Sequence, residues 1–297
     1  MNKMTCWKTT LAGVLGAVTL GVQAADVEIK PLRGQEVVRV CADAYNLPYS
    51  NRELEGFDNK IAEIIGEELG LPVEYYWFPQ RMGFARNTIN RLNPETGGYM
   101  CDIAFNIPTK SDMYLTSDPY FRSIEGMVYR ANDGYELNSM EDIARVSEEV
   151  RPLRIGIFDR ALTTKPLIDL GLRDQLTYFN IQPGGTTDNP GRTLIGPENS
   201  IASGDLDVVM IWGPIGSYFA NTSTDVPMNF VPLNELTDRY IFEFSAGFRR
   251  ADRRWRDVVN AIFEKRKDDI EAILTEYHLP SLDNVVPQSE RRVRVFE

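Results

Sequence analysis

Apolar residues along this chain follow two alternating patterns, short runs typical of buried strands and longer stretches with helical spacing. The β-branched run 37–43 predicts a first strand, and the stretch 57–70 predicts a helix, because its apolar residues recur every three or four positions. The runs 73–79 and 101–107 predict two further strands, with a helix over about 80–92 between them. Strands separated by helices of this length indicate right-handed crossovers and a parallel sheet.

The second half of the chain repeats this order. Strands are expected over 153–158, 175–182, 206–212 and 228–233, with helices near 165–170, 192–203 and 213–221. The third strand of each half ends in a Pro-marked turn, CDIAFNIP in one and LDVVMIWGP in the other. Such strands deliver their last residues to the carboxyl edge of an open α/β sheet, where these folds hold ligands. We therefore predict an α/β protein of two lobes, each a mostly parallel sheet flanked by helices, with a cleft between them.

Two segments link the two halves. The run 124–130 predicts a strand that leads out of the first lobe, and the run 242–250 predicts a strand that returns to it. A long amphipathic helix over 252–277 follows. With the family resemblance described below, this pattern assigns 25–130 plus 239–297 to a discontinuous first lobe and 131–238 to the second.

The first 24 residues have the features of a secretory signal peptide. Lys3 and Lys8 flank an apolar run of 14 residues, Thr9 to Val22, and small residues precede a cleavage site after Ala24. Because 14 residues are too few to cross a bilayer, an uncleaved anchor is the weaker alternative. We expect a mature protein exported to the periplasm and no membrane insertion.

The chain is acidic, with 32 basic and 43 acidic residues and a net charge of −11. Cleavage of the leader would remove two lysines and no acid, which makes the balance more negative. Such a surface repels phosphate backbones, so nucleic acid is excluded as an expected partner. The negative charge either steers the protein electrostatically toward a basic protein partner or serves ordinary solubility.

Two cysteines, Cys41 and Cys101, remain after removal of the leader. In an oxidising compartment an even pair favours a disulfide, provided that the Cα atoms lie within about 7 Å of each other. Two buried free thiols are the alternative. Two cysteines and one histidine do not fill a structural zinc site of four ligands, so no metal is expected.

Longer motifs connect the chain with a known family. These motifs are the strings VCADAYNLPYSN, GFDNKIAEIIGEELG, FPQRMGFARNT, CDIAFNIP, LTSDPYFRS, DNPGR, DVVMIWGPIGSYFA and EKRKDDIEAILTEY. Through them the chain resembles type II periplasmic solute-binding proteins over its mature length, and more narrowly MxaJ/XoxJ-type proteins, which are solute-binding-like accessory proteins of PQQ-dependent methanol dehydrogenase systems.

The resemblance also shows what has changed in the expected cleft. Amino-acid-binding relatives hold the substrate carboxylate with an Arg after the third strand, and Lys110 stands there, without the two-pronged hydrogen bonding of a guanidinium. They pair the ammonium group with an Asp after the corresponding second-lobe strand, where this chain has Trp212. These two changes argue against an amino-acid receptor.

Candidate cleft residues lie at the predicted strand ends and helix starts. They are Asp43, Asn46, Tyr49, Gln80, Arg81, Asn106, Lys110 and Arg122 in the first lobe, and Asp159, Asn189, Arg192, Trp212 and Tyr218 in the second. Trp212 either faces the cleft as a flat apolar surface or packs under the following helix. Arg81 either helps to bind an anion at a helix start or is a solvated surface charge.

No catalytic signature appears in the sequence. The single histidine, His278, follows the last predicted helix, and no nucleophile elbow, zinc-protease or phosphate-loop motif is present. We therefore expect no enzyme and no cofactor. The resemblance implies an accessory role with a PQQ methanol dehydrogenase as partner, and the alternative is a substrate-binding receptor of an ABC transporter for a small solute.

Overall fold

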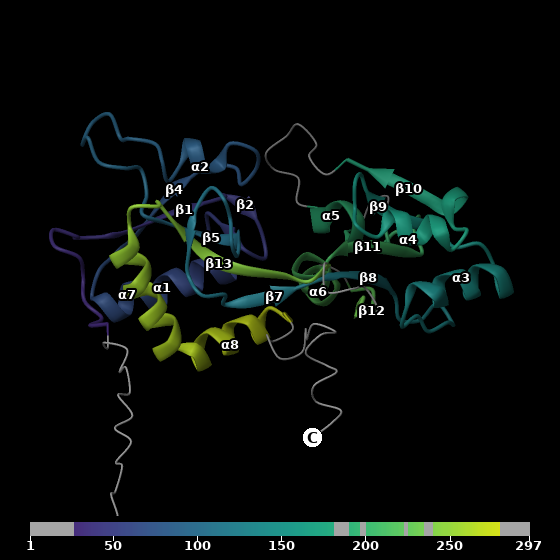
Figure 1. The fold of residues 1–297 in the computed structure, drawn as a ribbon. Coiled ribbons are helices and arrows are strands. Elements are labelled where there is room, and N and C mark those ends of the chain that lie inside the picture. Colours follow the sequence, from purple (N-terminus) through teal and green to yellow (C-terminus); the bar gives the residue numbers. More distant parts are fainter. Residues whose placement is uncertain (1–26, 181–189, 197–199, 223–224, 235–239, 280–297) are drawn as a thin grey trace, which may run out of the picture.

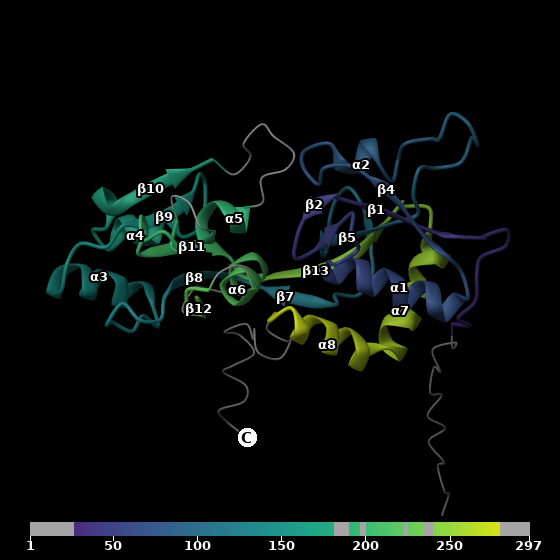
Figure 2. The same cartoon turned by 180° about the vertical axis from the view of Figure 1, so that it is seen from behind.

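The computed structural model describes residues 27–180, 190–196, 200–222, 225–234 and 240–279. They form two lobes side by side, each a sheet with helices on both faces (Figures 1 and 2). This arrangement confirms the predicted two-lobed α/β fold class. The expectation of mostly parallel sheets is wrong, because both sheets are mixed and the strands that lead between the lobes pair antiparallel with their neighbours. The expected signal peptide, residues 1–24, lies outside the described residues. Within the described ranges, none of the helices combines the length and apolarity that a bilayer crossing requires.

The first sheet has six strands. They are β1 (Val38–Ala42), β4 (Val73–Trp77), β5 (Ile103–Pro108), β6 (Leu115–Thr116), β7 (Phe121–Ser123) and β13 (Phe242–Phe248). The order is β4-β1-β5-β13-β6, and β7 also pairs with β13. β4 and β5 pair parallel with β1, whereas β13 runs antiparallel to β5. A short hairpin of β2 (Tyr45–Asn46) and β3 (Ser50–Asn51) follows β1.

The second sheet has the order β10-β9-β11-β8-β12. Its strands are β8 (Glu125–Arg130), β9 (Ile155–Phe158), β10 (Leu176–Phe179), β11 (Val208–Trp212) and β12 (Met228–Pro232). β9 pairs parallel with β10 and β11, while β8 pairs antiparallel with β11 and β12. Because β8 is a central strand here, the chain crosses between lobes at Ile124, ahead of the expected boundary at residue 130.

Helices α1 (Phe57–Leu69), α7 (Arg253–Lys265) and α8 (Lys267–Glu276) cover one face of the first sheet. Asn59 fixes the start of α1, since its side-chain oxygen accepts hydrogen bonds from the backbone N–H groups of Gly56 and Asn51. The long helix expected over 252–277 is wrong as a single element. It breaks at Arg266, whose φ of −107° and ψ of 23° are not helical, and α8 turns to pack against α1.

The other face of the first sheet carries α2 (Phe84–Asn87). The expected helix over 80–92 is therefore too long. Gly83 is left-handed, with φ of 87°, and Thr88 leaves helical geometry, with φ of −124° and ψ of −91°, so the helix is confined to a single turn. Buried on this face are Cys41, Phe84, Ala85, Ile89, Cys101, Ala104, Ile107 and Tyr114.

The second lobe has α3 (Met140–Glu149) and α4 (Thr164–Asp169) on one side and α5 (Pro190–Ile195) and α6 (Gly213–Thr222) on the other. A short 3₁₀ helix, Arg173–Gln175, precedes β10. Helix α3 was not expected; the Ser139 hydroxyl caps it by accepting a hydrogen bond from Asp142 N. Two separate buried clusters line the two faces of this sheet.

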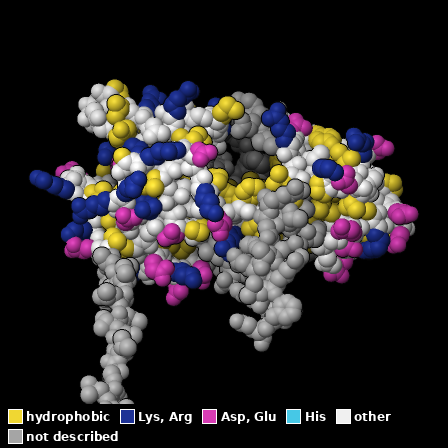
Figure 3. Space-filling model, viewed as in Figure 1, with side chains coloured by type: hydrophobic (Ala, Val, Ile, Leu, Met, Phe, Trp, Pro, Cys, Tyr) yellow, Lys and Arg dark blue, Asp and Glu magenta, His cyan; other side chains and the backbone are white. Residues whose placement is uncertain are grey.

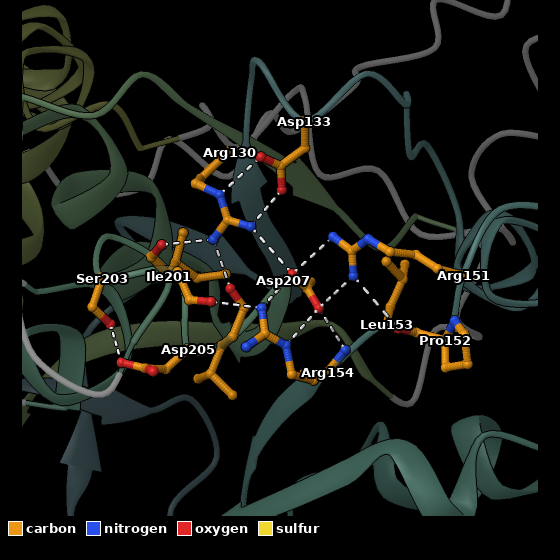
Figure 4. A network of polar contacts seen from close by, with 12 residues as sticks. Arg130, Asp133, Arg151, Pro152, Leu153, Arg154, Ile201, Ser203, Asp205 and Asp207 are labelled. Atoms are coloured by element: carbon orange, nitrogen blue, oxygen red, sulfur yellow. Dashed lines mark hydrogen bonds and ion pairs between the residues drawn. The ribbon is translucent and has the colours of Figure 1, made fainter.

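Arginine–aspartate clusters lie at the amino edges of both sheets. In the second lobe, Asp207 is fully buried and contacts Arg130, Arg151 and Arg154 at 2.9–3.2 Å (Figure 4). Burial alone would raise the pKa of Asp207, but the hydrogen bonds from Arg154 and Arg151 outweigh it and hold the pKa well below its usual value. The carboxylate is thus charged at neutral pH and ties three segments of the chain together.

The expected disulfide between Cys41 and Cys101 is present. The Cα atoms are 5.5 Å apart, which satisfies the geometric condition for a bridge. Cys41 lies in β1 and Cys101 just precedes the neighbouring strand β5, and both are buried. The bridge therefore joins two adjacent parallel strands on the face that α2 covers.

Candidate functional site

A cavity of about 490 Å³ lies between the lobes, at the carboxyl ends of the parallel strands. The surface is hollowed between the two lobes on the face shown in Figure 3. The cavity is lined by Asn46, Tyr49, Gln80, Asn106, Pro108 and Phe244 from the first lobe and by Glu125, Phe158, Arg160, Ala161, Met210, Ile211, Trp212 and Ile215 from the second. Its walls are mostly apolar, with a few polar groups among them.

Trp212, the last residue of β11, reaches from the second lobe to the first. Its Nε1 donates a 2.8 Å hydrogen bond to the Tyr49 hydroxyl, and its ring meets Phe242 and Phe244 edge-on at about 5.8 and 5.7 Å. Gly213 allows this approach, since a Cβ there would lie 2.4 Å from the Ile124 carbonyl oxygen. Trp212 thus contributes to the cavity wall and also packs against the first lobe.

Tyr49 and the groups behind it form a buried polar layer beneath the cavity. The Tyr120 hydroxyl donates to Asp58 at 2.7 Å and accepts a hydrogen bond from Asn106 N at 3.0 Å. Burial raises the pKa of Tyr49 and of Asp58 well above their usual values, more than their hydrogen bonds to Trp212 and Tyr120 lower them. Because the Tyr49 hydroxyl oxygen accepts the hydrogen bond from Trp212, the Tyr49 O–H group remains a hydrogen-bond donor at the cavity wall.

The polar rim of the first lobe is organised around Gln80. Its backbone N–H donates to Asp43 at 2.7 Å, and its side chain donates to the Phe105 carbonyl at 3.1 Å and accepts from Asn46 at 3.4 Å. Asn106 has a left-handed backbone, with φ of 55°, and its side-chain oxygen is buried without a hydrogen-bond partner. Asn tolerates this conformation better than most residues.

Several expected cleft residues lie elsewhere. Lys110 and Arg122 line a separate cavity of about 250 Å³, where Arg122 pairs with Glu243 at 2.8 Å. Asp43 supports Gln80 and is not part of the cavity lining. Arg81 and Asp159 are exposed beside the cleft without lining the cavity.

Of the remaining second-lobe candidates, the structure describes only the side chain of Tyr218. Tyr218 stacks on Tyr277 of the first lobe, with ring centroids 5.6 Å apart, and so helps to join α6 to the end of α8. Asn189 lies outside the described residues. Arg192 is in α5, but its side chain is not among those described.

Several residues that line the cavity are not among those predicted from the sequence. The most notable are Glu125, Phe158, Arg160 and Phe244. Phe158 is the last residue of β9 and Arg160 lies just after it. Ligands bind at the carboxyl ends of parallel strands, and this rule, which selected Trp212, also applies to these two residues. Glu125 and Phe244 belong to antiparallel strands, for which this rule gives no signal. In the described part of the chain, no group of three acidic, His or Cys side chains is arranged to hold a metal ion.

Comparisons with known proteins agree with this architecture. No protein-family model matches the chain. The crystal structure of periplasmic binding protein XoxJ from Methylobacterium extorquens AM1 is similar with a TM-score of 0.64 and 30% sequence identity, covering 82% of this chain and 99% of that one. MxaJ from Methlophaga aminisulfidivorans MPT has a similar fold, with a TM-score of 0.66 and 20% identity over 82% of this chain and all of its own.

A curated relative supports the same assignment from sequence. MoxJ from Methylorubrum extorquens AM1 is 26% identical over 294 residues, which cover 92% of this chain and 93% of the relative. The match with XoxJ combines nearly full coverage with the two-lobed fold and the cavity at its sheet edges. This chain is therefore a member of the MxaJ/XoxJ-type periplasmic binding proteins.

Proposed function

We propose that this protein is a non-catalytic periplasmic accessory protein of a PQQ-dependent methanol dehydrogenase, and that its cavity binds an exposed segment of that enzyme. Family membership supports the link to methanol oxidation. The observation that carries the binding role is the aromatic wall of the cavity. Trp212 stands where amino-acid receptors have an ammonium-binding Asp, and Lys110, at the place of their carboxylate-binding Arg, lies outside the cavity.

The test is co-purification of dehydrogenase with the tagged protein in a strain that lacks the chromosomal gene. We expect the wild-type protein to restore active dehydrogenase and retain it, and Trp212→Ala to weaken retention at least tenfold, because loss of a large aromatic anchor typically costs 2 kcal/mol or more. Val150→Ala, an exposed residue after α3, is the matched control. Unchanged dehydrogenase yield in the deletion strain would contradict the proposal.

A receptor for a small solute is the second candidate. The cavity volume of about 490 Å³ favours it, because small-molecule sites usually occupy about 300–1,000 Å³. Thermal unfolding with amino acids, organic acids, alcohols, lanthanide ions and PQQ separates the two, since a ligand raises stability by RT ln(1 + [L]/Kd). A strong shift with one metabolite, together with no dehydrogenase retention, would favour the receptor.

A further inference from the structure

Among the described residues that line the cavity, Glu125 is the acidic one, and it lies directly beside Trp212. It is the first residue of β8, and the antiparallel register places it opposite Trp212 of β11. Side chains of directly opposed residues in an antiparallel pair point to the same face of the sheet, with Cβ atoms about 5 Å apart. A carboxylate and an indole therefore line the cavity wall as neighbours.

The Glu125 carboxylate is buried without a cation. Its side-chain oxygens accept hydrogen bonds from the backbone N–H groups of Leu162 and Thr163, each at 3.2 Å. The residue is only 9% exposed, and among the described residues no Lys, Arg or His forms an ion pair with it. Buried carboxylates are normally paired, because an unpaired buried charge is costly. Burial raises the pKa of the Glu125 carboxyl, more than the hydrogen bonds from Thr163 and Leu162 lower it, so a cation bound beside it would favour its charged form.

The surroundings of Glu125 suit the stem of a long cationic side chain. Trp212, Phe158 and Phe244 provide flat apolar surface in the same cavity. Lysine and arginine lay their methylene chains along such surfaces, and their charged heads are attracted to an indole face. The acidic charge of the whole chain favours the approach of a basic partner.

We propose that the cavity receives a lysine or arginine side chain from a segment of the partner protein. The stem lies along Trp212 and Phe158, and the charged head meets Glu125. This inference rests on the proposed function and names the chemistry of the segment that is bound. Arg160, exposed at the same cavity, would instead favour a free amino acid that spans Arg160 and Glu125, and this is the competing outcome.

Glu125→Gln provides the central test, with Glu148→Gln on the exposed surface of α3 as the matched control. We expect Glu125→Gln to retain dehydrogenase at least tenfold more weakly than wild type, and Glu148→Gln to match wild type. The thermal midpoint of ligand-free Glu125→Gln should fall by only a few degrees, because the amide oxygen keeps one of the two backbone hydrogen bonds while the other N–H loses its acceptor. A tenfold loss of retention by protein that is still fully folded at the assay temperature distinguishes a binding role from a structural one. Equal retention by the two variants would overturn the inference and leave the accessory role standing.

Two capped peptides test the chemistry without the dehydrogenase. Acetyl-Gly-Leu-Lys-Leu-Gly-amide and its norleucine counterpart differ in the charged amine, and titration calorimetry measures both. We expect the lysine peptide to bind at least tenfold more tightly, and Glu125→Gln to abolish the difference. This result would support the cation site even if the dehydrogenase were not retained. Equal binding of the two peptides, or binding of free lysine without binding of the capped peptide, would overturn it.

Discussion

In each lobe an aspartate precedes the third strand of the parallel set, and two arginines from equivalent positions bind it. In the first lobe, Asp102 contacts Arg39 of β1 and Arg249 at the end of β13, at 3.1 and 3.0 Å. In the second, Asp207 contacts Arg154 just before β9 and Arg130 at the end of β8. The sheet orders β4-β1-β5-β13 and β10-β9-β11-β8 correspond strand by strand, so the two arginine–aspartate clusters occupy corresponding places in the two lobes.

The two clusters differ in burial and in their other partners. Asp207 has a side chain that is 0% exposed and a third arginine, Arg151, whereas Asp102 is 17% exposed. The first lobe instead has a disulfide beside its cluster, since Cys101 precedes Asp102. The same edge of the sheet is thus held by a buried charge cluster in one lobe and by a more exposed cluster with a covalent bond beside it in the other.

The opposite edges have no such correspondence. The first lobe presents hydrogen-bonded amides around Gln80, and the second presents Trp212, Phe158 and Glu125. Parallel strands hold ligands at their carboxyl ends, so changes there alter binding without disturbing the amino-edge clusters. The comparison separates the edge of each lobe that is held by a charge cluster from the edge that lines the cavity.

The largest expected effect is on Asp207. Asp207→Asn should destabilise the protein by about 3–5 kcal/mol, because three guanidinium groups lose the buried charge that compensates them. Urea unfolding followed by circular dichroism measures this change. A loss below about 1 kcal/mol would show that the cluster does not hold the second lobe together.

The pH dependence of the unfolding free energy provides a control for the charge of Asp207. The pKa of Asp207 is lowered in the folded state, so its contribution is fully present above the pKa of an unfolded Asp, about 3.9, and is lost as the pH falls below it. Wild type should therefore lose stability between about pH 4 and pH 2 more steeply than Asp207→Asn. Parallel stability curves for the two proteins would contradict the charged state assigned to Asp207.

Removal of the disulfide should have the next largest effect. The Cys41→Ser, Cys101→Ser double variant should lose about 2–4 kcal/mol, because the bridge closes a loop with a sequence separation of 60 residues and restricts the unfolded chain. Unfolding with and without reductant measures the loss in wild type. The double variant should no longer respond to reductant, and a response would show that the change acts elsewhere.

Asp102→Asn should be milder than Asp207→Asn. We expect a loss of about 1–2 kcal/mol, because the carboxylate is partly exposed and Arg249 keeps a second partner in Asp252. Urea unfolding of both variants under identical conditions gives the comparison. An equal or larger loss for Asp102→Asn would remove the distinction between the two clusters.

The smallest effect concerns fluorescence. Trp77, Trp212 and Trp255 are the tryptophans of the described residues, and of these three Trp212 lines the cavity. Binding of the dehydrogenase segment should shift tryptophan emission by a few nanometres in wild type and much less in Trp212→Phe, which keeps an aromatic wall. A full shift in Trp212→Phe would place the reporting residue outside the cavity.

Much of the fold follows from sequence pattern, because it depends on local periodicity. The strand 37–43 and helix 57–70 agree with β1 and α1 to within a few residues, and the Pro-marked ends of β5 and β11 identified the edge at which the cavity lies. Boundaries failed where backbone geometry overrode periodicity, as at Gly83 and Arg266.

The sequence determined the two-lobed α/β architecture, the likeness to MxaJ/XoxJ-type proteins and the replacement of the amino-acid anchors, since these are properties of residue order and spacing. Tertiary structure decided which side chains share the cavity. Glu125 comes beside Trp212 only through antiparallel pairing of β8 with β11, and Phe244 reaches the cavity from a strand that returns to the first lobe. Such neighbours are set by long-range strand pairing and by packing between the lobes, which local pattern does not encode.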